Sequence, residues 1–165
     1  MFKTKLLILL LINFIFLSCT KNSPDYNKVK YSVGYVSGEY DGLVFKNLLT
    51  SNLSNLDLYD SSSIYKIESS ISHSSGLFIT NIDNTSDRMR VNSEATFEIV
   101  DQRFKCVSNK FKKSISQYYI FADTDKYISN NEAEKKIKEE NTEALIKDFI
   151  NKLKKPKAIC KKLNE

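Results

Sequence analysis

The chain is poor in the residues from which many enzyme sites are built: its 165 residues include four glycines, two prolines and one histidine. There is no glycine-rich phosphate loop, and neither the G-x-S-x-G nor the H-E-x-x-H motif occurs. The histidine, His73, lies in a serine-rich segment without a cysteine or carboxylate at metal-ligand spacing, and we interpret it as a surface residue. The sequence therefore predicts a protein that is not an enzyme, with no metal site and no cofactor.

Long hydrophobic runs are also scarce. The sequence has one, and it lies at the N-terminus. Residues 6–17 are apolar but for one asparagine; Lys3 and Lys5 precede them and Ser18-Cys19 follows. A run of about 12 residues suits a signal peptide, whereas a spanning helix needs about 20. A transmembrane anchor, or an ordinary signal peptide with a chance cysteine, is the alternative. We favour a bacterial lipoprotein signal over residues 1–18, with lipidation of Cys19.

Lipidation would make Cys19 the first mature residue and attach it to a membrane. A thioether-linked diacylglycerol and an N-acyl chain supply more than one acyl chain, and each buried methylene contributes about 0.8 kcal/mol, so the anchor is stable. Many bacteria with two membranes retain lipoproteins at the inner one when aspartate holds the second mature position. Thr20 stands there in this chain. We therefore expect a lipid-anchored protein on the periplasmic face of the outer membrane.

The charge of the chain is modestly positive. Lys3 and Lys5 supply two charges of the net +5, and the leader has no acidic residue, so the mature chain carries +3. Nucleic-acid-binding domains are typically much more basic, and export also argues against such a role. We expect no nucleic-acid partner.

Hydrophobic periodicity predicts one domain over residues 28–155, between a tether at 19–27 and a basic tail at 156–165. The predicted order is strand 28–36, helix 42–53, strand 64–72, strand 88–100, strand 104–121 and helix 129–154. Residues 73–87 are ambiguous, since 77–79 could extend the second strand past Gly76. Each helix has one apolar stripe that needs an apolar partner. We therefore predict an α+β fold, in which two amphipathic helices pack on one face of a four-stranded, mostly antiparallel sheet.

Particular residues predict where the helices begin and end. Asp41 is a good N-cap for the first helix. Ser129 and Glu132 fit a capping box at the start of the second helix, and Pro156 ends it.

Two cysteines remain besides Cys19. Cys106 lies in the middle of the chain and Cys160 in the polar tail. An oxidising periplasm permits them to pair, but their spacing does not fix a connectivity. We favour two unpaired thiols.

Basic side chains gather on two neighbouring strands. Arg88 and Arg90 are two residues apart in the most regular strand, so both point the same way. The next strand carries further basic residues, namely Lys105, Lys110, Lys112 and Lys113. Arginine offers a planar donor fork suited to phosphate and lysine a point charge, so a strand-borne basic patch would suit an anionic glycolipid. The simpler interpretation is a solvated sheet face whose charges are offset by Glu94 and Glu98.

The element order and several segments resemble the lipopolysaccharide-assembly lipoprotein family, LptE. Residues 88–99 are similar to the arginine, hydrophobic, alanine and aromatic pattern of that family's third strand. Residues 116–119 resemble its serine- and tyrosine-containing strand. The entry to the last helix at 131–134 and the opening block at 29–33 also fit.

The resemblance implies an α+β fold and association with the outer-membrane β-barrel LptD, whose lumen the lipoprotein partly plugs. It further implies help in assembling that barrel and in delivering lipopolysaccharide to the outer leaflet. In this family basic side chains on the sheet contact lipopolysaccharide phosphates. Arg88 falls on the family's recurrent arginine, and Arg90, Lys112 and Lys113 are further candidates. The alternative is another periplasm-facing lipoprotein, structural in the envelope or accessory to a secretion system.

Overall fold

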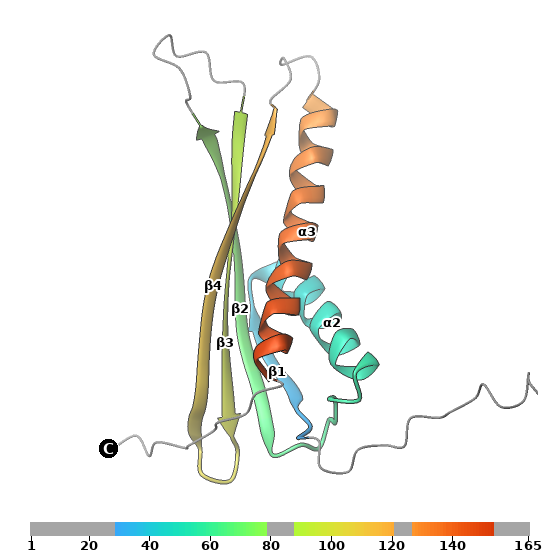
Figure 1. Cartoon of the computed structure of the whole chain (residues 1–165), viewed down its shortest axis with the longest axis vertical. Coiled ribbons are helices and arrows are strands. Elements are labelled where there is room, and N and C mark those ends of the chain that lie inside the picture. The colour runs from blue at the N-terminus through green and yellow to red at the C-terminus, as the bar shows by residue number, and fades with distance from the viewer. Residues whose placement is uncertain (1–28, 79–87, 121–126, 154–165) are drawn as a thin grey trace, which may run out of the picture.

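The computed structural model describes residues 29–78, 88–120 and 127–153 (Figure 1). They form, in chain order, β1 (Ser32–Ser37), α2 (Glu39–Asn55), β2 (Tyr65–Phe78), β3 (Arg88–Asp101), β4 (Cys106–Ile120) and α3 (Tyr127–Leu153). This is the predicted α+β order. The predicted leader, the tether, the basic tail, Cys19, Pro156 and Cys160 lie outside the described residues.

The four strands form one sheet in the order β1-β2-β3-β4. Strands β2, β3 and β4 pair antiparallel, whereas β1 pairs parallel to β2 after the crossover through α2. The sheet is thus mostly antiparallel, as predicted, with one parallel edge strand. Both helices lie on the same side of the sheet (Figure 1). We call the covered side the helix face and the opposite side the outer face.

Alternation along the strands sends apolar side chains to the helix face. On β3, Val91, Ala95 and Phe97 are completely buried, and Phe97 lies opposite Ser69 of β2 and Phe111 of β4. The residues between them, such as Glu94 and Glu98, belong to the outer face. This half-buried pattern is what made the third strand the clearest in the sequence.

The helices bury their apolar stripes against the centre of the sheet. Phe149 of α3 stacks on Phe97 with ring centroids 3.9 Å apart, and Phe45 of α2 reaches the same ring at 5.4 Å. Leu49 of α2 and Leu145 of α3 have no exposed surface. Burying one such side chain contributes about 1.5–3 kcal/mol, so this cluster holds both helices on one face.

A chain of buried polar side chains ties α3 to the sheet. Gln117 Nε2 donates to Asn141 Oδ1 at 2.9 Å, and Asn141 Nδ2 donates to Ser93 Oγ at 3.0 Å. Ser93 Oγ in turn lies 2.7 Å from His73 Nδ1. Because Asn141 and Ser93 are fully buried, no water can replace these partners. We call these four residues the polar relay.

The interpretation of His73 as a surface residue was wrong. Its ring is half-buried on the helix face, because the same alternation that buries Ile67 and Ile71 places His73 inward. Burial lowers the pKa of His73 below its ordinary value of 6.5, and Asp41 opposes this while Lys138 adds to it. The neutral form of the ring is thus favoured.

Both predicted helix caps were wrong. Helix α2 begins at Glu39 with Gly38 as its N-cap, so Asp41 lies inside the first turn. Gly38 has φ 130°, and a Cβ there would come within 2.6 Å of the Ile71 carbonyl oxygen, so the tight turn requires glycine. Helix α3 begins at Tyr127, which places Ser129 within the helix.

Cys106 is buried and disulfide-bonded. The expectation of an unpaired thiol at this position was therefore wrong; the residues that the structure describes contain no other cysteine, so the bonding partner falls outside them. Burial at the start of β4 keeps this sulfur away from solvent.

Strand β2 is longer than predicted, because it continues from Ser72 to Phe78. Its added residues pair with the first half of β3, ending with Phe78 opposite Arg88. Most of these residues are exposed, so the ladder of backbone hydrogen bonds, rather than burial, holds them in the sheet. This extension creates the site described next.

Candidate anion-binding site

The candidate site lies at the distal end of the outer face, where β2 and β4 end and β3 begins. Two rows of neighbouring residues cross the strands there. The first is Phe78, Arg88 and Ile120, and the second is Gly76, Arg90 and Tyr118. Arg88 and Arg90 are on the same face, as predicted from their spacing.

The rest of the outer face is electrically balanced. Three lysines each pair with a glutamate: Lys66 with Glu68 at 3.3 Å, Lys110 with Glu98 at 2.6 Å and Lys112 with Glu94 at 2.8 Å. Such exposed pairs contribute little stability, but they cancel the charge in this part of the sheet. As predicted, Glu94 and Glu98 offset positive charge on this face, and the charges that they offset are those of Lys112 and Lys110.

The described outer-face residues of the distal end include two arginines and no acidic residue. Among the described outer-face residues from position 72 to 78 of β2, 88 to 92 of β3 and 114 to 120 of β4, none is acidic. Within the described part of the chain, Arg90 forms no ion pair. The outer face is thus divided into a neutral half and a distal half that favours an anion.

A pocket of about 320 Å³ opens beside Arg90. Its lining residues are Ser74, Ser75, Gly76, Arg90, Asn92 and Ser116. A Cβ added to Gly76 would meet no atom within 4 Å, so the missing side chain leaves open space next to the guanidinium. The Ser75 hydroxyl donates to Glu134 Oε1 at 2.7 Å, so the Arg90 fork and the Ser74 hydroxyl are the suitable donors here for an oxyanion such as phosphate.

The polar side chains of this pocket were missed in the sequence. Ser116 Oγ donates to Asn92 Oδ1 at 2.9 Å, which links β4 and β3 across the pocket. They could be found only from the strand register. The register places Gly76 opposite Arg90, and the missing side chain of Gly76 leaves the space that these polar groups surround.

Apolar surface borders the pocket. Phe78 and Tyr118 meet edge to face, with ring centroids 5.0 Å apart. Ile120, beside Arg88 in the next row, is 74% exposed. An exposed apolar rim next to two arginines suits a ligand that carries both an anionic group and hydrocarbon.

The four predicted basic residues do not form one patch. Lys112 shares the outer face with Arg88 and Arg90 but lies in the neutral half, paired with Glu94. Lys113 was misplaced: it points to the helix face and pairs with Asp148 of α3. Consecutive residues of a strand face opposite sides of the sheet, so these two lysines could not both join Arg90.

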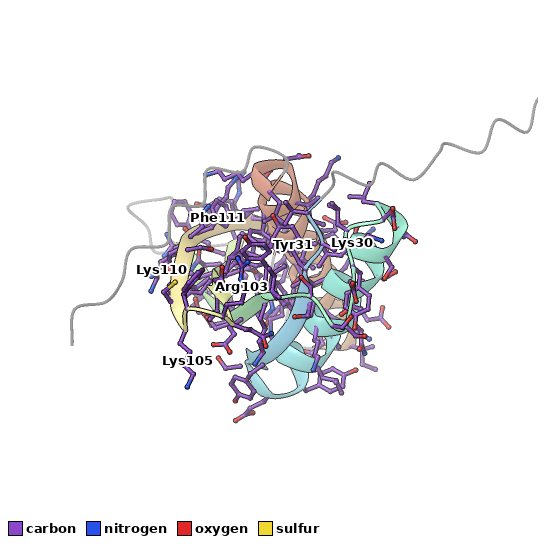
Figure 2. All side chains as sticks on the ribbon, turned by 90° about the horizontal axis from the view of Figure 1, so that it is seen from below. Lys30, Tyr31, Arg103, Lys105, Lys110 and Phe111 are labelled. Carbon is purple, nitrogen blue, oxygen red and sulfur yellow. The ribbon has the colours of Figure 1, made fainter. Side chains whose placement is uncertain are left out.

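The remaining lysines of this strand region lie toward the other end of the sheet. Figure 2 shows Lys105 and Lys110 near the β3–β4 turn, with Lys105 extending away from the molecule. Arg103 is held in the same turn by Asp101, whose Oδ2 accepts from Arg103 Nη2 at 2.8 Å. The hydrogen bond from Arg103 lowers the pKa of Asp101, although burial opposes it. These groups stabilise the turn and are remote from Arg90.

Neither of the described helices combines the length and apolar character needed to cross a membrane. No cluster of three or more potential metal-binding side chains occurs in the ranges 29–78, 88–120 and 127–153.

Comparison with known proteins identifies the fold. No protein-family model and no curated protein sequence matches the chain. Solved structures do: rare lipoprotein B from Shewanella oneidensis has a TM-score of 0.59 at 13% identity, covering 76% of this chain and 93% of that one. A lipoprotein from Caulobacter crescentus gives 0.55 at 15% identity, covering 76% and 93%. A minor lipoprotein from Acinetobacter baumannii gives 0.54 at 12%, covering 78% and 90%. The chain therefore has a fold found in bacterial lipoproteins.

Proposed function

We propose that this protein is an outer-membrane lipoprotein of the LptE type, anchored through Cys19 on the periplasmic side. In this role it partners an LptD-like β-barrel as plug and assembly factor. It also binds lipopolysaccharide on its way to the outer surface. The role is one of binding and assembly, without catalysis.

One observation carries the proposal: the domain shares its fold with solved bacterial lipoproteins. The lipoprotein signal predicted over residues 1–18 agrees with it. The match covers more than nine-tenths of rare lipoprotein B from Shewanella oneidensis, so it includes the whole domain rather than a common motif. The leader ends in Leu17-Ser18-Cys19, where lipidation is expected. The leader lies outside the domain whose fold is matched, so the two features are independent, and both favour a lipoprotein.

The distal site supports lipopolysaccharide as the ligand. The lipid part of lipopolysaccharide carries phosphates beside acyl chains. The site offers Arg90 and the Ser74 hydroxyl next to the exposed apolar groups of Phe78, Tyr118 and Ile120. A guanidinium can bind a phosphate through two parallel hydrogen bonds. Arg88 is the second candidate contact, since it lies two residues away on the same face.

Co-purification from detergent-solubilised outer membranes tests the partnership. We expect the tagged full-length protein to recover a large β-barrel. The Cys19→Ala variant, made without the lipid, should lose palmitate labelling and recover less barrel, because the anchor raises the local concentration of the domain. Recovery of secretion components or inner-membrane proteins without a barrel would support the alternative accessory role and contradict this one.

A further inference from the structure

The turn between β3 and β4 carries an exposed aromatic ring at the end of the sheet opposite to Arg90. The four residues of this turn, 102–105, are all exposed, and Phe104 is 65% exposed between Arg103 and Lys105. A single exposed apolar side chain is ordinary and needs no explanation. Phe104 is different because the turn that carries it is fixed in shape and has apolar neighbours.

A buried carboxylate fixes the conformation of the turn. Asp101 is 3% exposed and accepts hydrogen bonds from the backbone N–H of Arg103 at 2.9 Å and from its side chain. Lys105 has φ 49°, a left-handed conformation that residues other than glycine adopt rarely. The Arg103 guanidinium lies 5.3 Å from the centroid of the Phe104 ring. The turn therefore holds an aromatic ring at the surface between two basic side chains.

The turn lies at the same end of the sheet as the start of the described chain (Figure 1). The Gln102 N–H donates to the Ile64 carbonyl at 2.9 Å, and Ser63 Oγ donates to the Lys30 carbonyl at 2.6 Å. Three segments thus meet there, and two of them expose further apolar side chains, Ile64 at 41% and Val29 at 37%. We call this group the anchor end; it comprises Val29, Lys30, Ile64 and residues 102–105.

The length of chain before Val29 keeps the anchor end close to a membrane. This step rests on the lipid attachment at Cys19 in the proposed function. Val29 lies ten positions after Cys19, and an extended chain covers at most about 3.3–3.6 Å per residue. Val29 therefore stays within about 35 Å of the anchor. A short tether raises the effective concentration of one surface near another, so the lipid surface is the partner at hand for the anchor end.

We propose that the anchor end docks on the membrane in the free lipoprotein, before it joins a barrel, with the Phe104 ring entering the zone between headgroups and acyl chains. Aromatic rings and long basic side chains suit this zone, because the apolar part reaches hydrocarbon while the charge stays in water. Lys105, the next residue, extends away from the molecule (Figure 2). Its ammonium group is thus placed to remain among the headgroups.

Apolar contact, rather than electrostatic attraction, carries the docking, because the charges at this end are balanced. Besides the ion pair inside the turn, Asp57 is paired with Lys30 at 3.0 Å. The charge of Lys105 is offset by Asp60, whose N–H donates to the Tyr31 carbonyl at the start of the described chain. Salt screens exposed charges but not apolar burial, so the contact should persist at high ionic strength.

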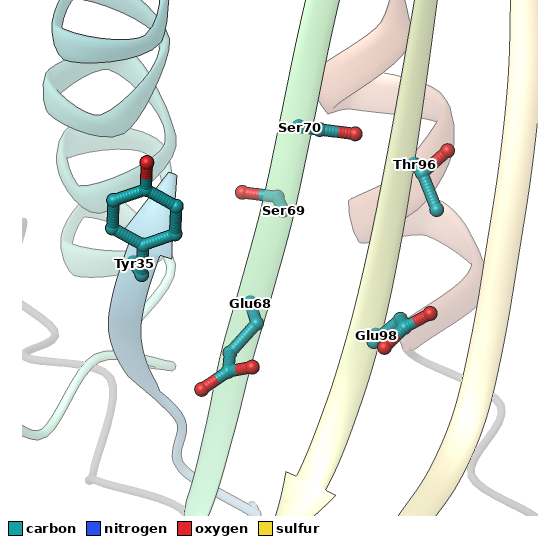
Figure 3. A pocket seen from close by; sticks show the side chains of 6 residues that line it. All are labelled: Tyr35, Glu68, Ser69, Ser70, Thr96 and Glu98. Carbon is teal, nitrogen blue, oxygen red and sulfur yellow. The ribbon is translucent and has the colours of Figure 1, made fainter. Parts of the chain in front are cut away.

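The two broad surfaces of the domain are less suited to a bilayer. On the neutral half of the outer face, a pocket of about 220 Å³ is lined mostly by polar side chains, including the carboxylates of Glu68 and Glu98 (Figure 3). The outward side of α3 exposes charges of both signs, among them Lys136 and Glu140. Burying such groups against lipid is costly, so the domain docks on its end instead of lying on either surface.

Tryptophan fluorescence of the full-length lipoprotein in vesicles tests this contact, because the chain has no tryptophan of its own. Phe104→Trp puts the probe in the turn. Ile128→Trp is the matched control, since Ile128 is 74% exposed at the start of α3, toward the distal end (Figure 1). The vesicles consist of phosphatidylethanolamine and phosphatidylglycerol and contain no other protein, so any change in emission comes from lipid.

We expect the Phe104→Trp emission to shift to the blue and to be quenched by brominated lipids, at low and at high salt. Interfacial side chains enter the headgroup and acyl boundary by about 5–10 Å, whereas the 14 residues of β3 hold the distal end about 45 Å from the turn. Quenching of Phe104→Trp should therefore exceed that of Ile128→Trp at least about threefold. Both variants replace exposed side chains and should keep the circular dichroism of the unmodified protein.

Flotation of the same vesicles separates the docking from the anchor. Flotation reports lipid attachment, whereas quenching reports the turn. Flotation without quenching of Phe104→Trp, equal quenching of the two variants, or quenching that disappears at high salt would overturn the docking and leave the anchor intact. Failure to float would contradict lipidation of Cys19, and the docking with it. Neither readout involves lipopolysaccharide or a barrel, so failure of those parts of the proposed function is measured separately.

Discussion

Replacing Asn141 with alanine should destabilise the domain by about 2–3 kcal/mol, because it removes the centre of the polar relay. Asn141 makes two hydrogen bonds, to Ser93 and from Gln117, and is completely buried. Each hydrogen bond contributes about 1 kcal/mol net. The loss is greater on the Ser93 side, because its buried hydroxyl has no access to water, whereas the half-buried Gln117 amide can turn toward solvent.

Urea unfolding, followed by circular dichroism, measures this cost. Asn151→Ala is the matched control, since Asn151 is exposed on the same helix and alanine is the better helix former. We expect that variant to change the free energy of unfolding by less than about 0.5 kcal/mol.

A double-mutant cycle with Ser93→Ala asks whether the two residues act through each other. Residues in one hydrogen-bond network couple by about 0.5–3 kcal/mol, whereas independent sites add. An Asn141→Ala cost no larger than that of the Asn151 control, or additivity within about 0.3 kcal/mol, would refute the relay as a stabilising unit.

Two further predictions concern His73 and Gly76. Because burial lowers the pKa of His73, the unfolded chain binds a proton that the folded chain does not, so the free energy of unfolding should fall as the pH drops below about 6.5. Denaturant melts between pH 7.5 and 5.5 should show this slope, and the same slope in His73→Gln would contradict it. Gly76→Val should keep the fold, since a Cβ there meets nothing, yet weaken lipopolysaccharide binding about tenfold by filling the pocket beside Arg90; equal weakening by Ser72→Val, outside the pocket, would refute a pocket-specific effect.

The fold could be predicted from the sequence because its patterns are long and consistent. The alternation along residues 88–101 and the apolar stripe that includes Leu145, Phe149 and Leu153 bury one face each, and only a two-layer arrangement satisfies both. The extension of β2 past Gly76 stayed open in the sequence, because its last residues are exposed and are held in the strand by pairing with β3. The start of α2 depends on the conformation of Gly38, which the sequence does not display.

The site was predicted only in part, because it too depends on how the strands pair. Spacing alone placed Arg88 and Arg90 on one face. It also implied that Lys112 and Lys113 face opposite sides, but each side of β4 carries both polar and apolar residues, so the sequence does not show which side is buried. Register supplies what is missing: it places Gly76 beside Arg90 and assigns each glutamate of the outer face a lysine.

Lipopolysaccharide binding by the distal site is the central claim, and a direct binding curve tests it. The purified lipoprotein in detergent should bind lipopolysaccharide saturably. Arg90→Glu should weaken binding at least about tenfold, whereas Lys105→Glu, with the same change of net charge at the opposite end of the sheet, should alter it less than about twofold. No binding by the unmodified protein, or equal weakening by both substitutions, would contradict a site at Arg90.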